Sequence, residues 1–271
     1  MQSFLHYLKE ESHSDGTVEK YRRDIQGFRE WLGERPASRE AAAAWRRQLT
    51  AQGYAPATVN SMLGAVNALF RYLGWDEFHA KALRVQRQIF RSEDRELSRE
   101  EYHRLVAAAR AKKRWRLELL LETICATGIR VSEVKYITVE AARQGKAEIS
   151  LKGKIRTILI PGKLARKLLK YCKKQKNASG EIFLTRSGKS MDRRQIWSEM
   201  KSLCAMAKVA ASKVFPHNLR HLFARVFYKA TQDVVKLADV LGHSSLETTR
   251  IYLIATGAEH AKALETLGLL I

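Results

Sequence analysis

Cysteine is scarce in this chain, and its placement argues against two common kinds of site. The 271 residues include three cysteines, Cys125, Cys172 and Cys204, which lie far apart inside apolar helical patterns without CxxC spacing or clustered histidines. A zinc site needs short, regular spacings of ligands, and a disulfide framework needs paired cysteines. We therefore expect buried, reduced thiols, no structural metal and no cofactor, as is typical of a cytoplasmic protein.

Long hydrophobic runs are also missing. No apolar stretch reaches the roughly 18 to 20 residues that a membrane-spanning helix needs. The first residues, MQSFLHYLKEES, have neither the basic start nor the apolar core of a secretion signal. We expect a protein that is neither exported nor anchored to a membrane.

Acidic residues are few relative to basic ones. Lys and Arg number 49 against 28 Asp and Glu, a net charge of +21, while a 45% hydrophobic content permits a folded core. Residues 1–90 carry 13 basic and 10 acidic side chains, so most of the excess lies in residues 91–271, with 36 against 18. This balance indicates a polyanionic partner, most simply nucleic acid; the alternative is a basic surface that serves solubility.

The first 85 residues predict a compact helical unit. One helical face is formed by apolar residues at spacings of 3 and 4: Val18, Tyr21, Ile25, Phe28 and Leu32. Further helices are expected near residues 38–53, after Pro56 and around Tyr7. Such a unit can clamp DNA or serve as a structural bundle. The polar, charge-dense residues 86–96 predict a linker.

A second domain is expected over residues 97–271. Its first helix begins at the capping box of Ser98 and Glu101, and an apolar helix ends at Gly128. Residues 146–160 alternate with period two around a lysine-rich tip, which predicts a β-hairpin. Beyond the hairpin we expect helices over residues 161–176 and 191–209, with a short strand at residues 182–184.

Four residues with side chains used in phosphoryl transfer occur within residues 217–252. They are His217, Arg220, His243 and Tyr252. A phenol can act as an oxygen nucleophile, a guanidinium grips phosphate, and an imidazole moves protons. A phenol has a reference pKa of about 10, so phenolate at pH 7 costs roughly 4 kcal/mol unless cations offset it. Arg130 and Arg220 are candidates for that offset, and a hairpin lysine is a candidate proton donor.

Four motifs follow one another in an order that is informative as a whole. They are ATGIRVSEV, a KGK hairpin 22 residues after Arg130, HNLRH, and LGHSSLETTRIY. This order resembles the catalytic core of the tyrosine recombinases, the phage-integrase family. The resemblance covers about residues 95–271 closely. It implies a mainly α fold with a small β-hairpin, in which a helical core-binding domain precedes a mixed α+β catalytic domain.

The resemblance also implies roles for individual residues. Arg130 and Arg220 match the two arginines that clamp the scissile phosphate. His217 would accept or share the proton of the nucleophile, and His243 would donate a hydrogen bond to a phosphate oxygen. Tyr252, nine residues after His243, would form a 3′-phosphotyrosyl bond with DNA, which a 5′-hydroxyl from a partner duplex reverses without ATP or metal.

The hairpin motif departs from the usual family pattern. It reads LKGKIR, where GKGNK is commoner, so Lys152 is the best match for the lysine that protonates the leaving 5′-oxygen and Lys154 is its rival. Glu133 would hold Arg130 in place. His221, which follows the second arginine, is interpreted as a buried structural histidine.

Three functions are consistent with these features of the sequence. The first is a site-specific recombinase acting on double-stranded DNA as a homo-tetramer, monomeric or weakly associated when free, with or without a second recombinase or accessory protein. The second is a relaxing topoisomerase, and the third is a helix-turn-helix DNA binder without catalysis. The LGHSS context favours the recombinase, which would work in the cytoplasm on the nucleoid and use residues 261–271 to contact a neighbouring protomer.

Overall fold

The computed structural model describes residues 1–84, 95–151, 154–243 and 245–252. The chain divides into two compact units, Met1–Arg87 and Gln88–Ile271. The predicted linker lies mostly outside the described ranges, and the division into functional domains stays a prediction. None of the helices in the described ranges is both long enough and apolar enough to cross a membrane.

The first unit is a bundle of helices. Its elements are α1 (Gln2–Glu10), α2 (Asp15–Leu32), α3 (Arg39–Ala51), α4 (Pro56–Tyr72) and a 3₁₀ turn, η1 (Asp76–Phe78). Local sequence explains where these helices begin. Ser14 and Ser38 cap α2 and α3 through their side-chain oxygens, and Pro56 is the first residue of α4. Phe28, Trp45 and other apolar side chains fill the core between α2, α3 and α4.

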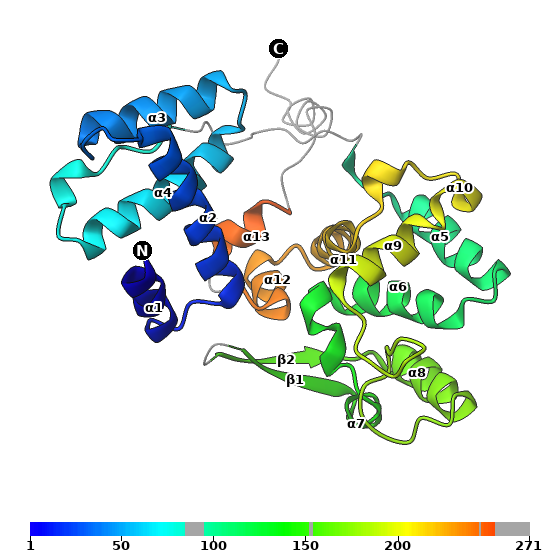
Figure 1. The fold of residues 1–271 in the computed structure, drawn as a ribbon. Coiled ribbons are helices and arrows are strands. Elements are labelled where there is room, and N and C mark those ends of the chain that lie inside the picture. Colours follow the sequence, from blue (N-terminus) through cyan, green and yellow to red (C-terminus); the bar gives the residue numbers. More distant parts are fainter. Residues whose placement is uncertain (85–94, 152–153, 244, 253–271) are drawn as a thin grey trace, which may run out of the picture. The chain divides into compact units, whose positions relative to one another are not determined.

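The second unit is also mainly helical and contains one small sheet (Figure 1). Its helices and 3₁₀ turns are α5 (Arg99–Ala111), α6 (Trp115–Thr127), η3 (Val131–Tyr136), α7 (Val139–Gln144), α8 (Gly162–Lys174), α9 (Arg193–Lys201), α10 (Cys204–Ala207), η4 (Ala211–Lys213), α11 (Pro216–Thr231), α12 (Val234–Leu241) and α13 (Leu246–Arg250). Helix α11 packs against α6 and α12, so that the HNLRH and LGH segments lie close to the end of α6.

The predicted hairpin is present. Strands β1 (Lys146–Leu151) and β2 (Lys154–Leu159) pair antiparallel, and Ala147 faces Ile158 in the register. Ile149, Ile158 and Ile160 are buried against the core of the second unit, as the alternation predicts. The hairpin packs on α7, which in turn contacts α8.

Two local expectations differ from the structure. Residues 182–184 form no ladder strand; the segment around them makes only isolated bridges, Thr138 with Glu181 and Leu184 with Ser190. The helix expected over residues 191–209 is interrupted after Lys201, and it ends at Lys208 in the left-handed conformation. In each case the apolar pattern was right about burial and wrong about backbone continuity.

Candidate active site

Arg220 lies at the centre of the candidate site and is only 1% exposed. It stands in the second turn of α11, and its guanidinium donates hydrogen bonds to the backbone carbonyls of Gly128 and, at 2.8 Å, of Leu241. Within the described residues no carboxylate forms an ion pair with it. Burial lowers the pKa of Arg220 from its ordinary value. The cation is thus held by neutral carbonyl dipoles and is not neutralised by an acid, which leaves its charge available for an incoming anion.

The hydroxyl of Tyr252 accepts a hydrogen bond from Nε of Arg220 at 3.4 Å. Tyr252 follows α13 and is 3% exposed, with its ring packed in a small apolar cluster that includes Leu237 and Leu241. The predicted nucleophile and one of the predicted phosphate-binding arginines are therefore brought together, although 32 residues separate them in the sequence.

His243 links Arg220 to the helix that precedes Tyr252. Its Nε2 lies 2.8 Å from a nitrogen of Arg220, and its Nδ1 lies 2.8 Å from Oγ1 of Thr249. A guanidinium has only donors, so Nε2 must accept, and the ring proton then sits on Nδ1 and is donated to Thr249. Burial, and after it the positive charges of the nearby arginines, lowers the pKa of His243 to about 4. His243 is accordingly neutral near pH 7 in this structure.

Arg130 and Glu133 form a second rigid pair beside Arg220. Gly128 ends α6 in the left-handed conformation, and Arg130 is the N-cap residue of η3. Glu133 accepts from the backbone N–H of Arg130 at 2.8 Å and from its guanidinium at 2.9 Å. Glu133 is 2% exposed, whereas the Arg130 side chain is 42% exposed. The buried acid thus orients an arginine whose outer face is open to solvent, as expected for a side chain that binds phosphate.

Two further histidines stand in successive turns of α11. His217 is exposed, and its ring centroid lies 5.8 Å from that of Tyr252. His221 is half-buried and stands between them, with ring centroids 4.6 Å from His217 and 4.4 Å from Tyr252. His221, predicted to be structural, is thus closer to the Tyr252 ring than His217 is.

A hollow of about 770 Å³ opens over these residues. Arg130, His217 and Arg220 line it on one side. Helix α9 contributes further lining residues with basic or aromatic side chains: Arg193, Arg194, Trp197 and Lys201. A cationic, partly aromatic surface of this kind suits the phosphate backbone of a nucleic acid.

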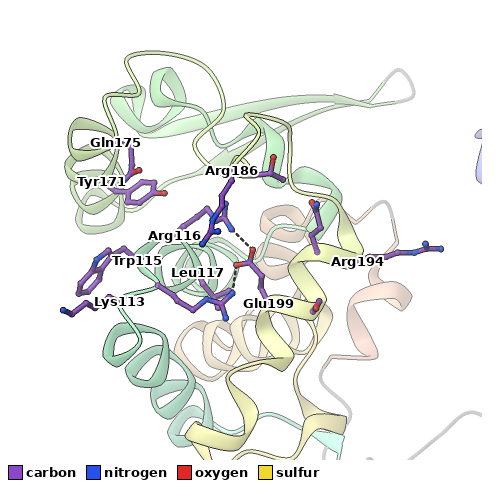
Figure 2. Close-up of a pocket in the computed structure, with 13 residues that line it drawn as sticks. Lys113, Trp115, Arg116, Leu117, Tyr171, Gln175, Arg186, Arg194 and Glu199 are labelled. Carbon is purple, nitrogen blue, oxygen red and sulfur yellow. Dashed lines mark hydrogen bonds and ion pairs between the residues drawn. The ribbon is translucent and has the colours of Figure 1, made fainter.

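The position of α9 is fixed by ion pairs beside a second hollow, shown in Figure 2. Glu199 of α9 bonds Arg116 at 2.5 Å and Arg114 at 3.1 Å, and both arginines flank the start of α6. Arg116 also donates to the carbonyl of Leu184. These contacts join α9 to α6, the helix whose end leads into Arg130.

The hairpin lysine is the one predicted catalytic residue that lies outside the described residues. Lys152 belongs to residues 152–153, which are not described, and Lys154 is the first residue of β2. The choice between the two lysines stays a prediction.

Arg156 and Thr249 were not predicted from the sequence. Arg156 donates to both oxygens of Glu133, at 2.9 and 3.0 Å, and Thr249 accepts the hydrogen bond that Nδ1 of His243 donates. Arg156 did carry a signal, because it falls in the same alternation as the inward-facing Ile158 and Ile160. An arginine on the buried face of a strand requires a partner in the core. Thr249 carried no such signal.

In the described ranges no three His, Cys, Asp or Glu side chains come together in a way that could hold a metal ion. The three cysteines are free thiols, two of them buried.

Sequence comparison identifies the class of protein that this site belongs to. Residues 95–258 match the phage integrase family, and residues 1–77 match its N-terminal SAM-like domain. Tyrosine recombinase XerA of Thermococcus kodakarensis is 30% identical over 273 residues, which cover 98% of this chain and 94% of the relative. Tyrosine recombinase XerD of Vibrio cholerae is 28% identical over 258 residues, covering 88% of this chain and 85% of the relative.

Solved structures share the fold at lower identity. The Tn1549 transposon integrase in complex with transposon right end DNA has a TM-score of 0.74 at 14% identity and covers 99% of both chains. A lambda integrase tetramer bound to a Holliday junction has a TM-score of 0.73 at 19% identity, covering 93% of this chain and 75% of the other. The chain belongs to the phage integrase family, the tyrosine-type site-specific DNA recombinases. The function and the fold class predicted from the ordered motifs are thereby confirmed.

Proposed function

We propose that this chain cleaves and rejoins double-stranded DNA through a covalent bond between Tyr252 and a 3′-phosphate. The observation that carries the proposal is the position of the Arg220 guanidinium. It bonds both the Tyr252 hydroxyl and His243, and it lines the same hollow as Arg130. A phosphate placed there would meet two cations, one of which is bonded to the hydroxyl of Tyr252.

The proposed chemical step combines these groups with the proton carriers that the family resemblance implies, His217 and Lys152. The phenol oxygen of Tyr252 attacks the phosphorus, the bond to the 5′-oxygen breaks, and the phenol proton passes to His217. Lys152 gives the departing 5′-oxygen its proton. Negative charge that develops on the non-bridging oxygens is balanced by Arg130 and Arg220, fixed cations that need no reorganisation during the reaction. Rejoining reverses the same bonds with a 5′-hydroxyl from a second duplex.

His243 has to change its hydrogen bonds when DNA arrives. Its Nε2 accepts from Arg220, so it cannot donate to a phosphate in that arrangement. A phosphate anion would draw the Arg220 donors toward itself and offset the positive charges that keep His243 neutral. His243 then takes up a proton and donates from Nε2 to a non-bridging oxygen.

The remaining parts of the proposal concern assembly. The helical unit of residues 1–85 acts as the core-binding domain that clamps DNA, joined by the linker of residues 86–96 to a catalytic domain of residues 97–271. The active form is a homo-tetramer on two duplexes, as in the lambda integrase tetramer bound to a Holliday junction. Residues 261–271 lie outside the described residues; in this proposal they contact the neighbouring protomer, so that deleting them impairs synapsis more than binding to a single site. The protein acts on the nucleoid in the cytoplasm.

The experiment uses end-labelled duplexes from the flanks of the gene and from a random library, nicked so that the cleaved fragment diffuses away. Wild-type protein should retain label in a denaturing gel. Tyr252→Phe should bind the same duplex and retain none. Tyr228→Phe is the matched control, because Tyr228 packs against the same apolar cluster and should keep cleavage. Retained label with Tyr252→Phe would contradict the proposal, and tight binding without label in the wild type would favour a non-catalytic binder.

A further inference from the structure

Three consecutive backbone carbonyls at the end of α12 each accept a hydrogen bond from a different arginine. Val240 accepts from Arg156 at 2.9 Å, Leu241 from Arg220 at 2.8 Å, and Gly242 from Arg130 at 3.4 Å. The last carbonyls of a helix have no partners within the helix and carry its partial negative charge. The end of α12 therefore acts as a common anchor for three cations.

Arg156 is the member of this set that does not line the hollow over the candidate site. It stands on β2, and its side chain is 12% exposed. Burial lowers the pKa of Arg156, and the charges of Arg220 and Arg130 act in the same direction, while Glu133 opposes them. Direct contact with a phosphate is not its role in this geometry.

Contacts of Arg156 instead reach the groups that hold the catalytic residues. One nitrogen bonds both carboxylate oxygens of Glu133, the acid that also fixes the backbone and the guanidinium of Arg130. The other nitrogen holds the carbonyl of Val240, three residues before His243. The side chain also fills the space beside Gly242, where a Cβ atom would overlap it.

We infer that Arg156 is a positioning residue, which sets the direction of the Arg130 guanidinium through Glu133 and fixes the turn that carries His243. This inference rests on the proposed function. Without Arg156, the carboxylate of Glu133 is bonded only to Arg130 and can change its orientation. Arg130 then loses its defined orientation toward the phosphate. Misplacing a reacting or stabilising group by about 1 Å can lower a rate by about 100-fold.

The test compares Arg156→Met and Arg156→Lys with the wild type on two nicked duplexes. One carries the normal scissile phosphate, and the other carries a methylphosphonate in which a neutral methyl group replaces a charged oxygen. Release of the strand that bears the 5′-hydroxyl is measured for both. On the phosphate, Arg156→Met should be slower by about 10- to 100-fold, and Arg156→Lys by less. DNA affinity should change less than threefold.

On the methylphosphonate the deficit of Arg156→Met should shrink to a few-fold, because there is less charge for Arg130 to balance. A general loss of structure would instead lower both rates equally. Arg143→Met is the matched control, since Arg143 also bonds a carbonyl, that of Ala178, on an exposed surface, and it should cleave like the wild type. Equal deficits on both substrates, or full activity of Arg156→Met on the phosphate, would overturn the inference. Failure of the wild type to cleave either duplex would count against the proposed function itself.

Discussion

Arg220 donates hydrogen bonds to both His243 and Tyr252, at 2.8 and 3.4 Å. Neither partner is a fixed anion, and both accept from the same cation. A phosphate that enters the hollow offers stronger acceptors than a neutral imidazole or a phenol. Substrate binding therefore competes directly with the hydrogen bonds that hold His243 and the proposed nucleophile, Tyr252.

Arg220→Met tests whether this arginine serves the fold as well as the reaction. The substitution leaves the carbonyls of Gly128 and Leu241 without their buried donor. We expect the free energy of unfolding to fall by about 1–3 kcal/mol, measured by chemical denaturation. Cleavage should be lost, while DNA affinity should fall modestly because many other cations contact the backbone. Unchanged stability would show that water replaces the guanidinium at these carbonyls.

His243 should make stability depend on pH. Its pKa in the folded protein, about 4, lies below the ordinary value of 6.5, so the unfolded chain binds more protons between these values. The free energy of unfolding should thus decrease as the pH falls from about 6.5 toward 4. His243→Gln keeps an acceptor for Arg220 and cannot titrate, so the free energy of unfolding of this variant should decrease less over the same pH range. Parallel pH profiles for the two proteins would contradict the assignment of His243 as neutral.

Gly128→Ala should destabilise the second unit at the end of α6. Gly128 has a φ of +65°, and a Cβ atom there would overlap the ring of Phe223. Gly180 is a matched control, because its φ of +77° imposes similar backbone strain in open space. Gly180→Ala should cost about 1 kcal/mol, and Gly128→Ala should cost about 1–3 kcal/mol more, because overpacking adds to the strain. If thermal or chemical unfolding shows that the two variants lose equal stability, Phe223 moves aside without cost.

Glu199→Gln tests the ion pairs that hold α9 against α6. Glu199 is 21% exposed and pairs with Arg114 and Arg116, so we expect a loss of about 1–3 kcal/mol in the free energy of unfolding. Glu148→Gln removes the exposed pair with Lys146 and should cost less than about 0.5 kcal/mol. If the two variants are equally stable, the contacts in Figure 2 do not fix α9.

Local patterns predicted much of the fold, because helix faces, caps and the hairpin depend on neighbouring residues. The box of Ser98 and Glu101 and the alternation of Ile158 and Ile160 appear in the structure as expected. Breaks were harder to predict. The helix interruption after Lys201 has no Gly or Pro to mark it in the sequence, and at this break Ser202 accepts hydrogen bonds from the distant residues Lys112 and Arg114.

The candidate site was predictable in its residue types but not in its supporting contacts. Arg130 and Arg220 stood out through motifs, whereas the pairing of Arg156 with Glu133 joins residues 23 positions apart. The protonation of His243 also could not be read from the sequence, because it depends on which atoms of Arg220 and Thr249 face the two ring nitrogens. Such contacts are set by the folded geometry alone.

The central claim is that Tyr252 itself becomes joined to DNA, and the most direct measurement is to identify the linked residue. Trapped covalent complex would be digested with nuclease and protease and analysed by mass spectrometry. The account predicts a nucleotide phosphate on Tyr252, in the peptide that follows Arg250. Attachment to another residue, such as Tyr228 in the same cluster, would contradict it.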